Sequence, residues 1–197
     1  MRAVEPLDEF PRARVVDGEW SDPDAPLDLL SNAVLLGART WTERELHRLV
    51  GAWARTSDDR VAVLADRLAM GHARRADVLY ARLPQLRELP ADSLVAAPGE
   101  RTARVVAHLG QLDDDHVRLA AWTEVSAALI GGYRAQLGRA TPVADAPLLR
   151  CLPLLLDELA LDRLAAEAVL DVGGGAASES VDGGLAALIE ASEHLTA

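Results

Sequence analysis

Apolar residues recur every three or four positions along most of the chain, and this spacing is typical of helices rather than strands. The clearest stretch covers residues 58–83 and ends at Pro84, because proline cannot continue a helix and restricts the residue before it. Its apolar stripe consists of Val61, Leu64, Ala65, Leu68, Ala76, Leu79 and Leu83. His72 falls in the middle of this stripe, so we expect its side chain to face the interior.

Residues 27–55 form an earlier helical region with a second start signal inside it. Thr42 and Glu45 have the spacing of a capping box, and Trp41 and Leu46 occupy the positions of a hydrophobic staple. The region is therefore expected to be either one helix bent between residues 37 and 42 or two short helices.

The longest regular pattern runs through residues 100–137, where core positions alternate by three and four residues. These positions are Val105, Leu109, Leu112, His116, Leu119, Thr123, Ser126, Ile130, Tyr133 and Leu137. Such a heptad seam predicts one long helix in a left-handed bundle, with Gly110 and the acidic run 113–115 as potential breaks. A fourth helix is expected from its N-cap, Asp145, to about residue 170, with a kink at Pro153.

These patterns divide the chain into three parts. Residues 1–26 hold four prolines among acidic residues and are expected to form an extended N-terminal arm. Residues 27–170 are predicted to form an all-α, four-helix bundle, because each helix has one apolar stripe to bury. Residues 171–197 contain a Gly-rich linker, followed by a short amphipathic helix at about 184–195.

The composition supports the all-α class, since the 197 residues include 36 Ala and 33 Leu but only 2 Ile. All 20 basic residues are arginine, which excludes lysine Schiff-base chemistry and is typical of high-GC actinobacterial genomes. With 31 acidic residues the formal charge is -11. An acidic surface repels phosphate backbones, so we expect no nucleic-acid partner.

Cysteine usage and hydropathy indicate where in the cell the protein is expected to be. Cys151 is the single cysteine and allows no disulfide within the chain, which favours a cytoplasmic location. Residues 1–6 lack the pattern of a signal peptide, and the apolar stretch 29–38 is too short to span a bilayer. We therefore expect no membrane partner.

Four-helix bundles can hold two-metal centres with Glu and Glu-x-x-His ligands from facing helices. No Glu-x-x-His occurs in this sequence, and the nearest match is Asp113-x-x-His116. The candidate ligands for a smaller, mononuclear metal site are Glu43, His72, His116 and Glu158, with Asp162 in place of Glu158 as a variant. Imidazole and carboxylate donors suit iron, zinc or manganese. Alternatively, the two histidines are core residues hydrogen-bonded to helix carbonyls or carboxylates.

Paired arginines are the other charged feature. Arg74–Arg75 and the spaced pair Arg101 and Arg104 are expected to form surface ion pairs with the many carboxylates. The alternative is a site for a small carboxylate ligand at the mouth of the bundle.

Two stretches resemble bacterial ferritin-like-fold proteins. Residues 70–84, MGHARRADVLYARLP, resemble their second helix, and residues 145–150, DAPLLR, running on to Asp157 and Glu158, resemble the start of their last core helix. The similarity covers about residues 27–170. It implies a four-helix bundle, often with a carboxylate-bridged di-iron centre that carries out oxidase or hydroxylase chemistry. The Glu-x-x-His pairs of such a centre are missing here, so its metal-ligand set is degenerate.

Three hypotheses follow. The first is a ferritin-like bundle without an intact di-iron site, acting without a cofactor as a self-associating binding or scaffold module for a small molecule or protein. The second is a metal-dependent oxidase or oxygenase with iron at a non-standard site and a small-molecule substrate. The third is a bundle that resembles the DinB type, which would imply a metal held by three histidines, here His47, His108 and His116.

Overall fold

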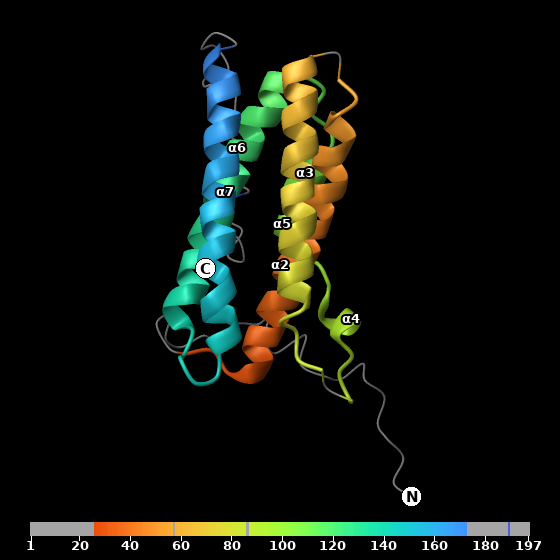
Figure 1. Ribbon diagram of the computed structural model, residues 1–197. Helices are drawn as coiled ribbons and strands as arrows, with labels where there is room; N and C mark the ends of the chain where they lie inside the picture. The colour runs from red at the N-terminus through yellow and green to blue at the C-terminus, as the bar shows by residue number, and fades with distance from the viewer. Residues whose placement is uncertain (1–25, 57, 86, 173–188, 190–197) are drawn as a thin grey trace, which may run out of the picture.

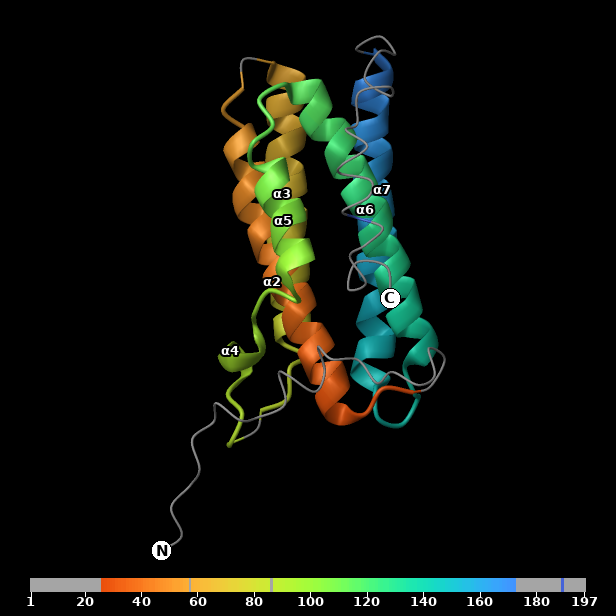
Figure 2. The same ribbon diagram turned by 180° about the vertical axis from the view of Figure 1, so that it is seen from behind.

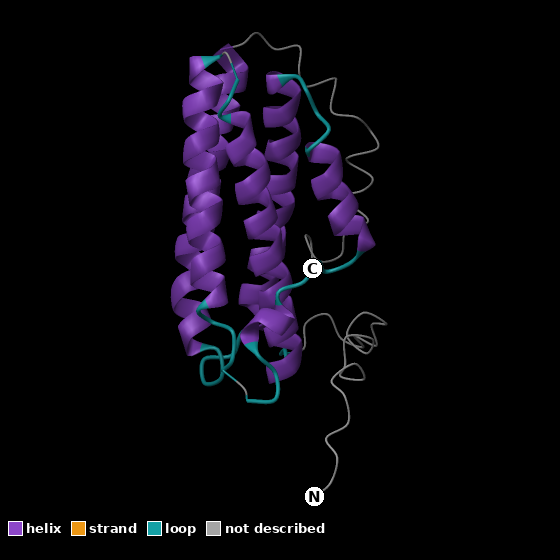
Figure 3. Ribbon diagram, turned by 90° about the vertical axis from the view of Figure 1, so that its right-hand side faces the viewer, coloured by secondary structure: helices purple, strands orange, loops and turns teal. Residues whose placement is uncertain are grey.

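The computed structural model describes residues 26–56, 58–85, 87–172 and 189. Within these residues every regular element is a helix, which confirms the all-α prediction (Figure 3). The four long helices are α2 (Leu29–Trp53), α3 (Asp59–Tyr80), α6 (Asp115–Arg139) and α7 (Ala146–Val172). Between α3 and α6 the chain forms the short helices α4 (Ala91–Leu94) and α5 (Glu100–Leu109).

The long helices lie side by side in two antiparallel pairs (Figure 1). α2 packs along α3, α6 packs along α7, and the two pairs approach each other most closely where α3 lies beside α7. Seen from behind, α5 lies against the first pair (Figure 2). Leucines such as Leu46, Leu68 and Leu152 are fully buried where these helices meet.

Three of the long helices begin at an aspartate whose carboxylate accepts a backbone N–H of the first turn. Asp28 accepts from the N–H of Ser31 at 2.7 Å, and Asp114 accepts from the N–H of Val117 at 2.9 Å. Asp58 accepts from the N–H groups of Arg60 and Val61. These caps satisfy backbone donors that have no partner within the helix.

The first helical region is one continuous helix, so of the two alternatives the single helix holds and the pair of short helices is wrong. The hydroxyl of Thr42 does not cap a new helix but donates to the carbonyl oxygen of Ala38, at 3.0 Å, within α2. Gly37 has a packing role, because a Cβ placed there would lie 2.1 Å from the carbonyl oxygen of Leu94. The glycine therefore allows the end of α4 to pack directly on α2.

The predicted single helix over residues 100–137 is also wrong. It is interrupted between Leu109 and Asp115, at the glycine and the acidic run that stood out as potential breaks. Asp114 starts a new helix as its N-cap, and the hydroxyl of Thr56, from the α2–α3 connection, donates to Asp115. An aspartate favours the cap over the helix interior, which outweighs the continuous heptad spacing here.

The other predicted boundaries agree within a few residues. α3 ends at Tyr80, three residues before the predicted Leu83, and α7 runs through Pro153. Asp145 precedes α7 as expected, but its carboxylate accepts from the side chain of Asn32 and the backbone of Thr141. The N-terminal arm and the C-terminal helix lie outside the described residues, apart from Pro26 and Ile189, of which Ile189 is helical and buried.

Candidate functional site

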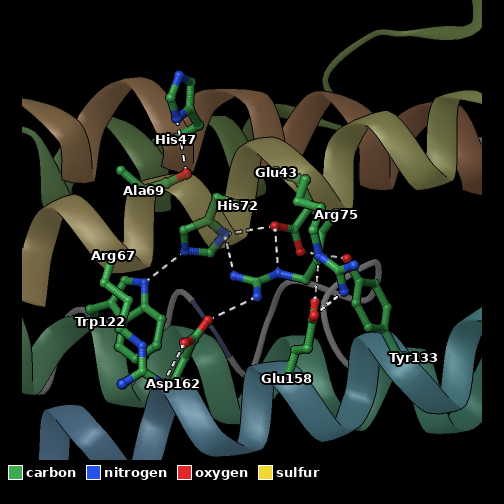
Figure 4. A network of polar contacts seen from close by, with 11 residues as sticks. Glu43, His47, Arg67, Ala69, His72, Arg75, Trp122, Tyr133, Glu158 and Asp162 are labelled. Atoms are coloured by element: carbon green, nitrogen blue, oxygen red, sulfur yellow. Dashed lines mark hydrogen bonds and ion pairs between the residues drawn. The ribbon is translucent and has the colours of Figure 1, made fainter.

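Six side chains from all four long helices form a connected set of hydrogen bonds and ion pairs inside the molecule, which we call the polar cluster (Figure 4). The cluster consists of Glu43 on α2, His72 and Arg75 on α3, Trp122 and Tyr133 on α6, and Asp162 on α7. None of the six is more than 6% exposed to solvent. Polar groups buried this deeply must satisfy one another, so their hydrogen-bond partners define their chemical state.

The carboxylate of Glu43 is the main acceptor of the cluster. Its Oε2 accepts from His72 Nδ1 at 2.6 Å and from Arg75 Nε at 3.1 Å, while its Oε1 accepts from the Tyr133 hydroxyl at 2.5 Å. Burial alone would raise the pKa of Glu43, but the Arg75 charge and these hydrogen bonds outweigh it and lower the pKa to about 2. Glu43 is therefore an anion at neutral pH.

His72 is neutral, and its tautomer follows from its neighbours. The indole N–H of Trp122 donates to His72 Nε2 at 2.9 Å, and an indole can only donate, so Nε2 carries no proton. The proton is therefore on Nδ1, which donates to Glu43. Burial lowers the pKa of His72, which agrees with this neutral form. A protonated ring would present a second N–H to the N–H of Trp122.

The guanidinium of Arg75 occupies the centre of the cluster. Its Nε contacts Glu43, its Nη1 donates to Asp162 Oδ2 at 2.9 Å, and its Nη2 lies 3.2 Å from His72 Nδ1. Burial would lower the pKa of Arg75, but the two carboxylates reverse this effect and raise it. A permanent cation thus lies between two buried anions and balances one of their two negative charges.

Asp162 connects the cluster to the surface of the molecule. Its Oδ1 lies 3.4 Å from Nη2 of Arg67, whose side chain is mostly exposed. Gly71 lies against the same ion pair, since a Cβ at this position would be 2.7 Å from Asp162 Oδ2 and 3.1 Å from Arg75 Nη1. The absence of a side chain at Gly71 therefore gives the ion pair the space that it occupies.

A second buried arginine flanks the cluster. Arg39 on α2 lies over the ring of Tyr133, 4.7 Å from its centroid, and donates to the carbonyl oxygen of Gly132 at 2.5 Å. Burial lowers the pKa of Arg39 to about 10, so it stays charged at neutral pH. Burial and the Glu43 carboxylate raise the pKa of Tyr133 well above its usual value, so its hydroxyl remains a donor.

The four predicted metal ligands do not form one site. Glu43 and His72 are in direct contact, but His116 is half-buried in the first turn of α6, and Glu158 pairs with Arg74 at the α7 surface. Among the described residues, no three His, Cys, Asp or Glu side chains form a group that could hold a metal ion. The variant ligand Asp162 does join the cluster, but through Arg75 rather than through a shared metal position.

The histidines of the DinB-type triad have other surroundings. His47 Nδ1 hydrogen-bonds with the carbonyl oxygen of Ala69, at 2.9 Å, on the outer side of the α2–α3 pair (Figure 4). His108 is half-buried on α5, a separate helix from α6, which carries His116. The interruption of the predicted third helix therefore places His108 and His116 on two different helices.

The prediction that Arg74 and Arg75 both form surface ion pairs is half wrong. Arg74 is exposed and pairs with Glu158, whereas Arg75 is buried. A signal for this difference was present, because Leu68, His72, Arg75 and Leu79 continue the alternation of four and three residues along α3. In α2, Arg39, Glu43, Leu46 and Val50 alternate in the same way. Charged residues at such seam positions indicate an internal ion pair.

Two grooves open on the surface of the described part of the molecule. One, of about 540 Å³, runs between α3 and α7 and is lined by Arg67, Met70, Gly71, Arg74, Glu158, Leu161 and Asp162, among others. The other, of about 430 Å³, runs between α2 and α5 and includes Trp41, Leu49, Trp53 and Val106. The first groove reaches the cluster at Gly71 and Asp162, so it is the place where the polar interior comes closest to solvent.

Comparison with known proteins identifies no relative. No family model, no curated protein and no solved structure matches the chain. In the part of the chain that the structure describes, no helix is long and apolar enough to cross a membrane. The chemistry of the cluster itself is therefore the basis on which a function can be argued.

Proposed function

We propose that this protein is a ferritin-like four-helix bundle in which an internal ion pair replaces the metal centre, and that it acts as a binding or scaffold module rather than as an oxidase. The observation that carries the proposal is the position of Arg75. Its guanidinium touches Glu43, Asp162 and His72, the three side chains that a shared metal ion would have to touch.

The donor set does not fit an additional cation. Both oxygens of Glu43 already accept hydrogen bonds, and both ring nitrogens of His72 are occupied by Glu43 and Trp122. A hard divalent cation needs ligands with free lone pairs and a site without a fixed positive charge. Arg75 cannot lose its proton in the physiological range, so its charge opposes any metal placed beside it.

The cluster also lacks the features of a catalytic site. Its ionised carboxylate is fully hydrogen-bonded and buried, and its one imidazole is held in a single tautomer by two partners. A general base needs a lone pair that can reach a substrate proton. A fully satisfied network instead fixes how the four helices pack, and it leaves the outer faces and grooves for binding.

The metal content of the purified protein tests the proposal. Full-length protein prepared without a metal-binding tag should contain well under one iron, zinc or manganese per chain by mass spectrometry of the metals. It should develop no oxo-bridged absorption band after addition of ferrous iron and oxygen.

The rival function is the metal-dependent oxidase. Stoichiometric iron that is lost in Glu43→Ala or His72→Ala, but kept in the matched surface variant Glu158→Ala, would overturn the proposal. The helical circular dichroism of each variant shows whether a loss of metal merely reflects unfolding. Retention of iron in all three variants would indicate adventitious binding and leave the proposal standing.

A further inference from the structure

We propose that two copies of this chain associate through the outer face of α3 and α7, which stack on their counterparts in antiparallel fashion about a two-fold axis near Met70 and Leu161. The large apolar side chains exposed on this face are Val63, Met70, Leu154, Leu161, Leu164 and Val172, each 59–72% exposed. A second copy of the chain would be the partner of the proposed binding module. The exposed residues of this face support the dimer independently of the metal content.

Helix α7 is apolar on two sides. Its inner side carries Leu152, Leu155 and Leu159, which are buried in the core. On its outer side Leu154, Leu161 and Ala168 repeat every seven residues, and all three are exposed. A helix that packs against neighbours on one side only has a polar opposite face, so a second apolar seam indicates a second packing partner.

The neighbouring helix continues this face. Val63 and Met70 on α3 are also seven residues apart and exposed, and Met70 and Leu161 line the same groove. Figure 1 shows that α3 and α7 run side by side in opposite directions. Two helices about 10 Å wide and 30 Å long present on the order of 600 Å² in projection, close to the area that a standard interface buries on each partner.

The charges on the face favour a second copy as the partner. Arg150 lies eleven residues before Leu161 and Asp171 ten residues after it, and both are exposed. On α3, Asp66 and Arg74 each lie four residues from Met70. A two-fold axis at Met70 and Leu161 therefore places Arg150 opposite Asp171 of the second copy. It also places Arg74, which pairs with Glu158 in its own chain, opposite Asp66 of the second copy.

Each of these pairs occurs twice across an isologous interface, so four pairs of opposite charge flank the apolar residues Met70 and Leu161 at the axis. The same axis places Leu154 against Ala168 of the second copy, a large residue against a small one. The chain carries a formal charge of -11, and two copies repel each other at long range. A local match of opposite charges is what fixes the register of two such acidic surfaces.

Sedimentation velocity of the full-length protein over about 1–200 µM tests the interface, a range that covers the affinity of modest homodimers. The native chain should sediment as a dimer in the upper part of this range. Leu161→Asp should raise the dissociation constant about tenfold or more, because it buries two like charges beside the axis. Val143→Asp is the matched control, since Val143 is 95% exposed and lies outside this face.

A charge exchange tests the register. Arg150→Asp and Asp171→Arg should each weaken the dimer, and the double variant should restore it. A native chain that stays monomeric throughout, a dimer equally stable in Leu161→Asp, or a double variant weaker than both singles would overturn the proposal. Thermal unfolding followed by circular dichroism shows whether each variant is folded. Because metal content is measured separately, a metal-free monomer would refute this interface and leave the proposed function intact.

Discussion

The guanidinium of Arg75 contacts three other members of the cluster, namely Glu43, His72 and Asp162. Its positive charge pairs with both Glu43 and Asp162 and offsets one of the two negative charges that are removed from water there. Removing one partner of a buried ion pair is costly because the other partner keeps its charge without compensation. The neighbouring Arg74, in contrast, pairs with Glu158 where both side chains reach solvent.

We therefore expect Arg75→Met to lower the free energy of unfolding by about 3–5 kcal/mol, the usual cost of leaving a buried charge unpaired. Arg74→Met should cost no more than about 1 kcal/mol, because exposed ion pairs contribute little. Urea unfolding at neutral pH, followed by circular dichroism, measures both. Equal effects of the two substitutions would contradict the central role of Arg75.

The protonation states of the cluster predict how stability depends on pH. The pKa of His72 is lowered below its ordinary value of 6.5 in the folded protein, so as pH falls the unfolded chain binds a proton that the folded chain does not. The contribution of neutral His72 to the free energy of unfolding is fully present above pH 6.5. Below pH 6.5 the free energy of unfolding falls by up to about 1.4 kcal/mol per pH unit. Glu43 affects stability at lower pH, because its pKa is lowered from 4.5 to about 2 in the folded protein. Its contribution to the free energy of unfolding is lost as the pH falls from 4.5 to about 2.

The free energy of unfolding of the native protein and that of His72→Gln should be measured between pH 7.5 and 5 and compared. Glutamine offers an NH2 donor group and an oxygen acceptor that do not titrate, so the variant should lose less stability than the native protein over this interval. A native protein that becomes more stable toward pH 5, or a variant with an identical slope, would contradict the neutral form of His72.

At the level of helices, Gly37 shows how a close contact sets the packing. The carbonyl of Leu94 lies where a side chain at position 37 would have to be, and a backbone atom cannot rotate away. Gly51, in the same helix, has only an ordinary contact, with its Cβ position 3.6 Å from the Cβ of Ala69. The two glycines therefore differ in the effect of adding a methyl group.

We expect Gly37→Ala to destabilise the protein by about 2–4 kcal/mol, because overpacking displaces α4 or distorts α2. Gly51→Ala should instead raise stability by up to about 1 kcal/mol, since alanine is the better helix former. Thermal unfolding of both variants gives the comparison. Stabilisation by both substitutions would mean that α4 does not pack on α2 as described.

The helices themselves could largely be predicted from the sequence, because each has a stripe of leucine and alanine at helical spacing. The errors arose where local and global signals disagree. In α2 the capping-box spacing at Thr42 left a second helix start open as an alternative, but Thr42 lies buried inside one continuous helix. At residues 110–114 the heptad continued in the sequence, while Asp114 formed a cap instead.

The polar cluster could be predicted only in part. Glu43 and His72 were recognisable as interior groups, and they do meet. Their chemistry was not recognisable, because it depends on a third residue, Arg75, and a long arginine side chain can either bury its charge or extend to solvent. Trp122, which fixes the tautomer of His72, lies off the predicted seam of residues 100–137. Such partners become visible only once the helices are placed.

For the molecule as a whole, the arginine at the centre means that no metal should be needed to hold the two helix pairs together. The α3 and α7 helices are joined there by the contact of Arg75 with Asp162, and α2 and α6 by the contact of Glu43 with Tyr133. Removal of metals with a chelator should therefore leave the thermal unfolding midpoint of the native protein unchanged.

The converse substitution should create a metal site. In Arg75→His the cation is removed, and the new imidazole faces the Glu43 and Asp162 oxygens that the guanidinium contacts in the native protein, which together supply donors that zinc accepts. At about 100 times its Kd, a metal that binds only the folded state adds about 2.7 kcal/mol, which is a rise of several degrees in the unfolding midpoint. We expect Zn²⁺ to give this rise in Arg75→His and in neither the native protein nor the surface control Arg74→His. If Arg75→His unfolds at the same temperature with and without Zn²⁺, the donors around Arg75 do not converge on one point, and the guanidinium does not occupy the position of a metal ion.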